Sequence, residues 1–328
     1  MSIISSQLDR TIQWGLGDKL ARALRKLSVE RLADEPQGIS ESVPRIFYVD
    51  SGNSRAAATN DGLEPLNPFS TIQQAINACT ANRGDYIMVA PGHTETVVAA
   101  SGLTLNKAGV SIVGLGRGAN RPTINFTTAT TASMVVSAAD CKMDNFLFTG
   151  GVDALVNPVH IQAADFELTN IETRDVTGQA TDFIVTTAAA DRLHIADWFH
   201  NGAAAAGADT AISIVGGDAI VIEDFRITGN FAVACIENVT TAATNIVIRG
   251  KSGPSLLQTV NAADVVVALA ATTTGFVGPN INAQLKDNAA NITEAFVGAA
   301  VVFFQPINIV NLAGESSMQT NITASTDI

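Results

Sequence analysis

A short pattern returns at nearly constant intervals along residues 139–245, and it limits the folds open to this chain. Each copy contains an aspartate or asparagine, an alternating apolar stretch, a polar break and a second short apolar run. The residues that begin the copies are 25, 26, 27 and 27 positions apart: Asp140, Asp165, Asp191, Asp218 and Asn245. Asp264 and Asn291 form a further pair, again 27 apart, after an irregular step. Self-similarity of this length is typical of a solenoid.

The period inside each copy indicates the kind of solenoid. Ile220-Val221-Ile222 and Ile246-Val247-Ile248 are β-branched runs whose side chains alternate between two faces, as in strands. A copy has no room for a helix besides its strands, and the Leu-x-x-Leu-x-Leu spacing of leucine-rich repeats is absent. Several short strands in about 26 residues predict one turn of a parallel β-helix, stacked at about 4.8 Å on the next turn.

The flanking segments divide the chain into three parts. We expect the β-helix over residues 45–297, with a first segment and a capping helix over 45–97. Residues 1–44 are expected to form a helical anchor arm and a polar, proline-containing linker. Residues 298–328 break the period and are predicted to form an irregular C-terminal cap, because an uncovered last turn would leave an unpaired strand edge.

The arm carries a helical pattern over residues 8–33, with apolar side chains at spacings of three and four and basic side chains on other faces. The residues that define it are Ile12, Leu16, Leu20, Leu24 and Leu27 on the apolar face and Arg22, Arg25 and Lys26 elsewhere. One interpretation is a helix packed on its own domain. The other is a basic amphipathic arm that docks on a neighbouring subunit or a larger assembly.

Composition and charge exclude some functions. Only 15% of the residues are charged, which leaves little charge to solvate a long isolated coil, so we expect part of the outer surface to be buried in an oligomer. The net charge of −12 argues against nucleic acid as a partner, because phosphate neutralisation requires concentrated lysine and arginine. Residues 1–33 are the exception, with six Lys/Arg against three Asp/Glu.

Cysteine usage and hydropathy point to a reducing compartment of synthesis. Cys79, Cys141 and Cys235 are odd in number, widely spaced and in apolar contexts, so we expect buried thiols and not disulfides. No cluster has metal-ligand spacing, and we expect no metal or cofactor. No secretory signal is visible, and the most apolar run, residues 295–304, is too short to span a bilayer.

The segment before the repeat predicts strands at IFYVDSGN and YIMVAPG, with Ser70 as the cap of a short amphipathic helix, TIQQAINAC. The stretches FYVDSGN, NDGLEPLNPFSTIQQAINAC and GDYIMVAPGHTETV resemble the N-terminal part of pectate-lyase-like right-handed β-helix proteins. The resemblance implies that the helix caps the first turn. It also implies that the ladder, meaning the stack of parallel turns, continues to about Asn291. The expected fold is therefore all-β: a right-handed parallel β-helix solenoid with a short N-terminal helical segment and an irregular C-terminal cap.

Together with its separate helical segment and low-charge ladder, the chain is similar to bacteriophage virion proteins: tailspikes, fibres and capsid decoration proteins. That resemblance implies a homotrimer, with residues 298–328 as candidate trimer contacts. It also implies the major capsid or tail proteins as partners, and a location in the virion after synthesis in the host cytoplasm.

Aligned repeats place side chains in columns, and two outward columns carry the candidate catalytic residues. The first reads Lys142, Glu167, His194, Val221 and Val247, and the second Leu147, Glu172, Phe199 and Arg226. The alignment places Glu167 and His194 one turn apart, near Glu172. A carboxylate pair such as Glu167 and Glu172 is what glycoside hydrolysis requires, with Asp144 and Glu223 behind them. The alternative, which we favour, is ordinary ion pairing on a solvated face.

Two absences weigh against catalysis. Polysaccharide grooves use aromatic platforms, but the chain has two Trp and two Tyr, and the column of Trp198 is apolar, which predicts a core position. The calcium–aspartate cluster and catalytic arginine of pectate lyases have no counterpart in the repeats, so that activity is not expected.

Three further motifs have a structural interpretation. His93 and Glu95 form a potential proton relay, but a turn contact is favoured. The Asp/Asn column that begins the repeats lacks the spacing of calcium repeats, and we expect it to cap backbone amides or form ladders between turns. GLGRG at 114–118 has no following helix and is interpreted as a turn.

The leading hypothesis is a non-enzymatic phage structural protein, a trimeric head decoration, cement or spike protein attached through its N-terminal arm. The alternative is a tailspike depolymerase, a glycosidase or lyase, acting on host surface glycan. A bacterial surface lyase is disfavoured because no signal peptide is visible.

Overall fold

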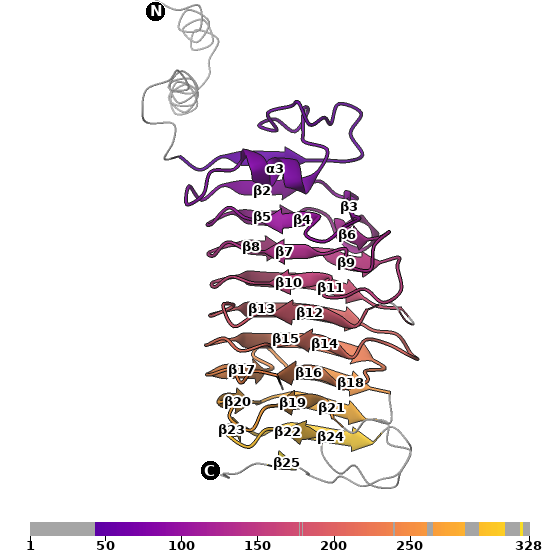
Figure 1. Ribbon diagram of the computed structural model, residues 1–328, viewed down its shortest axis with the longest axis vertical. Helices are drawn as coiled ribbons and strands as arrows, with labels where there is room; N and C mark the ends of the chain where they lie inside the picture. Colours follow the sequence, from indigo (N-terminus) through magenta and orange to yellow (C-terminus); the bar gives the residue numbers. More distant parts are fainter. Residues whose placement is uncertain are drawn as a thin grey trace, which may run out of the picture. The chain divides into compact units, whose positions relative to one another are not determined.

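The computed structural model describes residues 43–176, 178, 180–238, 240–260, 265–285, 295–311 and 322–323. Residues 45–328 belong to one compact unit. The predictions for the arm, including its apolar and basic faces, lie outside the described residues, as do those for Asp264 and Asn291. The described part is a nearly all-β parallel β-helix, as expected, in which every turn crosses three faces (Figure 1).

Face 1 is a stack of ten parallel strands in register. Its strands are β1 (Ile46–Val49), β2 (Tyr86–Val89), β5 (Ser111–Gly114), β8 (Lys142–Asp144), the first halves of β11 (Glu167–Arg174), β13 (His194–Asn201) and β15 (Val221–Gly229), and then β17 (Ile246–Arg249), β20 (Gly275–Val277) and β23 (Val301–Phe303).

Face 2 begins where each turn rounds a corner after face 1. Its strands are β3 (Thr94–Val97), β6 (Thr123–Phe126), β9 (Leu147–Gly150), the second halves of β11, β13 and β15, and then β18 (Ser255–Thr259), β21 (Ile281–Leu285) and β24 (Ile307–Asn311). Because β11, β13 and β15 run through the corner, faces 1 and 2 form one continuous sheet.

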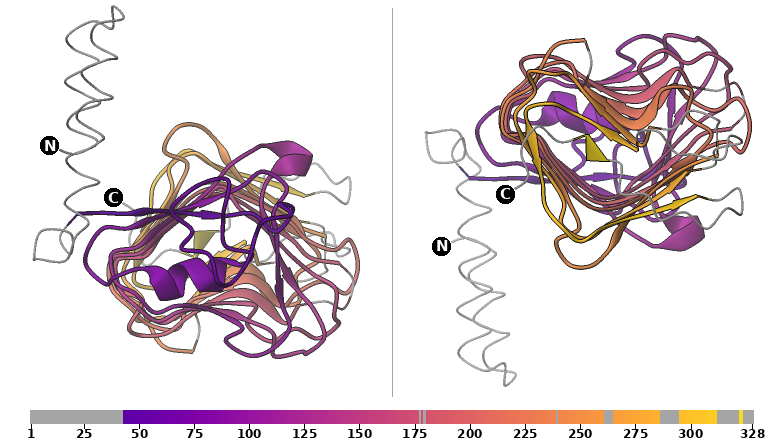
Figure 2. Two further views of the ribbon diagram at one scale, coloured as in Figure 1. Left: turned by 90° about the horizontal axis from the view of Figure 1, so that it is seen from above. Right: turned by 90° about the horizontal axis from the view of Figure 1, so that it is seen from below.

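Face 3 is a separate sheet that closes each turn. Its strands are β4 (Leu103–Leu105), β7 (Met134–Val136), β10 (Val159–Ile161), β12 (Asp182–Thr186), β14 (Thr210–Ser213), β16 (Ala234–Asn238), β19 (Val267–Leu269), β22 (Phe296–Val297) and β25 (Ile322–Thr323). Viewed along the stack, successive turns superpose around one interior (Figure 2).

The interior is filled by one inward side chain above another. The predicted inward pairs are all buried: Cys141/Met143, Phe166/Leu168, Leu193/Ile195, Ile220/Ile222 and Ile246/Ile248. Trp198 is 1% exposed, between Ile171 and Phe225 in register, so its predicted core position is confirmed. The three cysteines are free and buried, also as predicted. Stacking of this kind buries apolar surface at every turn, which is the main stabilising term.

The helix α3 (Ile72–Ala78) covers the first turn and buries Ile72, Ala75 and Ile76 against β1, β2 and β4. The prediction that Ser70 caps this helix is wrong by one residue. Thr71 is the N-cap: its hydroxyl accepts from the Gln74 amide at 3.3 Å, and the Gln74 side chain accepts from the Thr71 amide at 3.2 Å. Ser70 instead donates its hydroxyl to Gln74 Oε1, because that glutamine closes the capping box.

His93 and Glu95 hold this helix to the first turns, as the turn-contact interpretation predicted. The Ser51 amide donates to His93 Nδ1 at 3.0 Å, so Nε2 carries the proton and donates to Glu95 Oε2 at 3.1 Å. The same oxygen accepts from the Ile72 amide at 2.7 Å. A carboxylate on the first amides of a helix stabilises the helix end.

The corner before face 1 uses left-handed backbone at one position in each turn: Asp140, Asp165, Arg192, Ala219 and Asn245, with φ of 57°, 56°, 54°, 56° and 55°. In two of these turns the left-handed residue is the one after the aspartate of the sequence repeat: Arg192 follows Asp191, and Ala219 follows Asp218. These two turns hold one extra residue before the strand. The predicted ladder between turns is present: Asp191 Oδ1 accepts from the Asp218 amide at 2.8 Å, and Asp218 Oδ1 from the Asn245 side chain at 2.7 Å.

The corner between faces 1 and 2 is short in four consecutive turns and longer in the turns before and after them. Left-handed Asn145, Asn170, Asp197 and Asp224 occupy the corner in four consecutive turns. Glu223 and Arg226 are three positions apart in β15. Their partners in the next turn, Arg249 and Leu256, are seven positions apart. Six residues, 250–255, therefore stand where the preceding turn has two, and the four extra residues extend the corner into an outward loop.

Strand pairing continues past the boundary expected at residue 297. β23 pairs with β20 and β24 with β21, and Val301, Ile307 and Ile309 are buried. The paired strands are still 26 residues apart there, Gly275 with Val301 and Ile281 with Ile307, so the turn length and the alternation of buried residues both persist where the sequence pattern is no longer recognisable. Within the described residues, no helix is long and apolar enough to cross a membrane.

Candidate functional site on faces 1 and 2

The two outward columns predicted from the sequence are both present in register. On face 1, Lys142, Glu167, His194, Val221 and Val247 pair in sequence from β8 to β17. On face 2, Leu147, Glu172, Phe199 and Arg226 do the same from β9 to β15. The candidate catalytic residues therefore lie on the outer surface of neighbouring strands, where they were expected.

Glu167 and Glu172 each have cationic partners in the same chain. Glu167 accepts from Lys142 Nζ at 2.9 Å, with both side chains about 40% exposed. Glu172 lies between Arg174, whose Nε is 2.6 Å from Oε1, and Arg121, whose Nη1 is 3.5 Å from Oε2. Both carboxylates are thus engaged by cations of their own chain.

His194 turns away from Glu167 and bonds Glu223, its diagonal neighbour in the next turn, at 3.0 Å. Glu223 is 3% exposed and also binds Arg249 at 2.9 Å and Lys251 at 2.8 Å. Burial alone would raise the pKa of Glu223, but the hydrogen bonds from Lys251, Arg249 and His194 outweigh burial and lower that pKa to about 2. A carboxylate held in this way is a poor general acid, because it gives up its proton far below neutral pH.

Glu167 and Glu172 lie on the same strand but on either side of the corner at Asn170, so they belong to different faces. Each is held by its own cations, Glu167 by Lys142 and Glu172 by Arg174 and Arg121. A glycosidase pair needs carboxylates about 5 to 9.5 Å apart, and the pairing of these two on one glycosidic bond stays a prediction.

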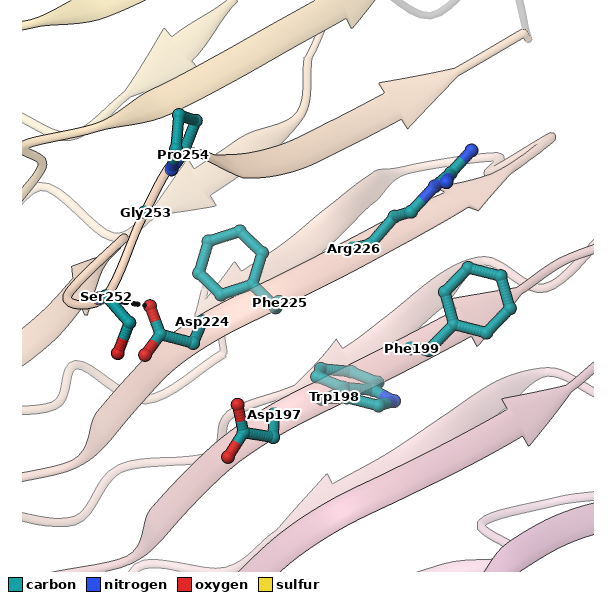
Figure 3. A pocket seen from close by; sticks show the side chains of 9 residues that line it. All are labelled: Asp197, Trp198, Phe199, Asp224, Phe225, Arg226, Ser252, Gly253 and Pro254. Atoms are coloured by element: carbon teal, nitrogen blue, oxygen red, sulfur yellow. Dashed lines mark hydrogen bonds between the residues drawn. The ribbon is translucent and has the colours of Figure 1, made fainter. Parts of the chain in front are cut away.

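A surface depression of about 500 Å³ lies beside these residues, where β13 and β15 round the corner (Figure 3). The loop at 250–255 forms one wall. The residues that line it are Asp197, Trp198, Phe199, Asp224, Phe225, Arg226, Ser252, Gly253 and Pro254. The longer corner of this turn stands beside the short corners of β13 and β15, and the depression lies between them.

Two corner carboxylates of neighbouring turns face this depression. Asp224 accepts from the backbone amides of Lys251 and Ser252, both at 2.8 Å. Burial raises the pKa of Asp224, but these hydrogen bonds outweigh it, and the pKa is lowered. Within the described part of the chain, Asp197 is exposed and forms no hydrogen bond. Asp197 is therefore an acceptor that remains available to a ligand.

An aromatic ring and a cation form the opposite side of the depression. The Arg226 guanidinium carbon lies 5.6 Å from the centre of the Phe199 ring. A cation over an aromatic ring contributes about 0.5–1 kcal/mol at an exposed site and holds the guanidinium in place. The depression thus offers a carboxylate acceptor, guanidinium donors and a small apolar surface.

Sequence reasoning missed the two corner aspartates, although a signal was present. Asn145, Asn170, Asp197 and Asp224 recur five or six residues after the residue that begins each repeat, and Asn and Asp are the side chains that best tolerate left-handed backbone. The described residues contain no group of three or more His, Cys, Asp or Glu arranged to hold a metal ion.

No protein-family model matches the chain, and no curated protein matches its sequence. Among solved structures, the chain is similar to a rhamnogalacturonan lyase, with 13% identity over 82% of this chain and 86% of that chain, and a TM-score of 0.34. A likeness of this level carries no argument about function. The parallel β-solenoid agrees with the expected fold, whereas the superfamily and its bacteriophage branch stay predictions.

Proposed function

We propose that this chain is a non-enzymatic structural subunit of a virus particle, a homotrimeric head decoration, cement or spike protein. The observation that supports this most is the state of the candidate carboxylates. Glu167, Glu172 and Glu223 are all bound by cations of their own chain, so their present arrangement serves the ladder.

The function of such a subunit is mechanical. Stacked turns must separate together for the ladder to open, which slows unfolding and gives kinetic stability. In this proposal the basic amphipathic segment over residues 8–33 attaches each copy to capsid or tail proteins. Three linked attachments raise the overall affinity without new contacts in any one of them.

The experiment compares the full chain with a variant lacking residues 1–33. We expect the variant to keep its β-rich circular dichroism and its oligomeric mass but to lose co-sedimentation with virus particles. A variant that stays bound to particles would contradict the attachment role. Antibody labelling of intact particles tests the location directly, and particles that carry no label would overturn the proposal.

A second candidate function is recognition or cleavage of a host surface glycan, favoured by the depression beside Asp197. The Asp197 carboxylate has no partner among the described residues. Together with the Arg226 guanidinium donors and the Phe199 ring, it is a group that binds hydroxylated ligands. The test incubates the purified protein with host polysaccharide and measures released oligosaccharides. Release that disappears in Glu167→Gln or Asp197→Asn would replace the structural proposal with the enzymatic one.

A further inference from the structure

The three faces of the ladder offer different outer surfaces, and only one of them suits contact with another copy of the chain. Face 3 is acidic around β12 to β16: Glu237 lies in its outward column, Asp182 begins β12, and Asp209 lies just before β14. Burial raises the pKa of Asp182, and the charges of Glu237 and Asp209 raise it further. Two copies meeting through face 3 would bring like charges together, which is unfavourable.

Face 2 mixes hydrophilic side chains with Phe199, Leu256 and Val310, and several of its amides are already hydrogen-bonded. Gln258 donates to Gln284 at 3.1 Å, and Asn308 donates to Asn282 at 2.9 Å, each pair in register between neighbouring turns. Removing these amides from water would gain little, because their best partners are in the same chain.

Face 1 is apolar at both ends of the ladder. At the N-terminal end, Ile46 and Tyr86 pair in register and remain 44% and 43% exposed. At the other end four apolar side chains follow one another in the same outward column: Val221, Val247, Phe276 and Val302. Phe304, 48% exposed, extends this end, with its ring 5.4 Å from that of Phe276.

The centre of face 1 is charged but balanced. It carries two cationic side chains, Lys142 and Arg249, and three carboxylates, Asp144, Glu167 and Glu223, and Lys251 reaches Glu223 from the corner loop and completes the balance. This balance contrasts with the net charge of −12 for the whole chain. If two copies lie side by side, parallel and with equivalent turns level, the apolar ends of face 1 contact each other, and so do the two charge-balanced centres. Lys142 of one copy would then reach Glu167 of the next, since the two lie one turn apart at about 4.8 Å.

We propose that face 1 is the surface through which copies of this chain associate, side by side and in parallel. This rests on the homo-oligomer of the proposed function and names the face that forms it. Ten strands at about 4.8 Å give a length of roughly 45 Å, and a width of about 13 Å gives roughly 600 Å² for each copy. A pair then buries about 1,200 Å², the lower bound for a specific interface.

The first experiment introduces single cysteines and oxidises the full-length protein. Val247→Cys on face 1 is expected to give disulfide-linked pairs, because parallel copies bring equivalent residues together. Gln258→Cys on face 2 and His160→Cys on face 3 are the matched controls and are expected to stay unlinked. The native thiols are buried and provide little background. Linking from either control but not from Val247→Cys would overturn the choice of face.

The second experiment places a charge on the apolar end. Phe276→Asp and Phe304→Asp are expected to weaken association at least tenfold, measured by sedimentation over a range of concentrations. Unchanged circular dichroism shows that the ladder is intact. Association as strong as in the unmodified chain would contradict the proposal.

Two further outcomes separate this inference from the proposed function. If the unmodified chain is monomeric at all concentrations, the face 1 interface is wrong. If it associates through face 1 but is absent from virus particles, the interface stands and the structural role in the virion is wrong. If residues 1–42 cover face 1 instead, Val247→Cys will react with a thiol reagent only after their removal, and the inter-chain assignment is overturned.

Discussion

Two buried aspartates bind backbone amides of their surroundings but differ in their other partners. Asp85 lies directly before β2 in the first turns, and Asp175 lies directly after β11 in the middle of the β-helix. Asp85 is 0% exposed and accepts from the Arg45 amide at 2.9 Å and the Thr80 amide at 2.8 Å, and both its oxygens bind the Arg83 guanidinium. Asp175 is 4% exposed and accepts from the Ala180 and Ala208 amides at 3.1 and 3.0 Å.

The difference in partner reverses the effect of burial on the pKa. Burial raises the pKa of Asp85, but the hydrogen bonds from Arg83, Arg45 and Thr80 outweigh it, and the pKa is lowered. Burial also raises the pKa of Asp175, where amides alone do not outweigh it, and that pKa is about 6. Backbone amides are enough to position a carboxylate, whereas a cation is needed to keep it charged at low pH.

The largest effect is expected from Asp85→Ala. This change leaves the Arg83 side chain, only 5% exposed, without its carboxylate and frees two amides. Breaking a buried ion pair in this way costs about 3–5 kcal/mol. Urea unfolding at pH 7 measures the loss, and Asp61→Ala, an exposed aspartate of the same region, is the control. A loss below about 1 kcal/mol would mean that the first turns do not depend on this pair.

His200 sharpens the comparison, because it is a buried group of the ladder that must stay neutral. Its ring lies among Phe183, Trp198 and Phe231, and its Nδ1 is 2.7 Å from Thr173 Oγ1. Its Nε2 has no hydrogen-bond partner among the described residues. Burial lowers the pKa of His200 to about 3. Stability is therefore lost as the pH falls below about 6.5, where the unfolded chain binds a proton that the folded one refuses.

We expect His200→Phe to remove this loss, which amounts to about 3 kcal/mol between pH 7.5 and 4.5. The readout is the unfolding free energy of both proteins at the two pH values. An equal acid sensitivity of variant and parent would show that His200 does not contribute.

Asp175→Asn is expected to act in the opposite direction. With a pKa of about 6 in the folded chain, Asp175 gains a proton on folding, so its contribution improves as the pH falls from about 7 to 4. The asparagine cannot titrate, and this improvement of about 2 kcal/mol should vanish. Unfolding midpoints at pH 7.5 and 4.5 test this, with Asp153→Asn, at an exposed aspartate, as the control. A variant that retains the improvement would assign it to another group.

The smallest effect is expected from Glu167→Gln. Its pair with Lys142 is exposed, and such pairs contribute about 0.2–1 kcal/mol. Glu223→Gln on the same face is the contrast: its carboxylate is 3% exposed among three cationic partners, and the change should cost about 1–3 kcal/mol. Equal losses in the two variants would contradict the role of burial.

The sequence predicted the columns because strand alternation is local. Each inward position, and the outward column from Lys142 to Val247, follows from period-two patterning within one turn. The partner of His194 did not follow, because the choice between Glu167 and Glu223 depends on how side chains reach diagonally between turns. Likewise, the loop at 250–255 reads as a broken period, and only the paired strands show that four residues leave the ladder and return in register.

That loop has a practical consequence. The chain departs from the ladder after Arg249 and rejoins it at Ser255, while the turns on both sides keep their pairing. This corner already tolerates four additional residues. A peptide epitope inserted genetically at Gly253 would therefore be displayed on the outside of the β-helix without disturbing the pairing of its strands.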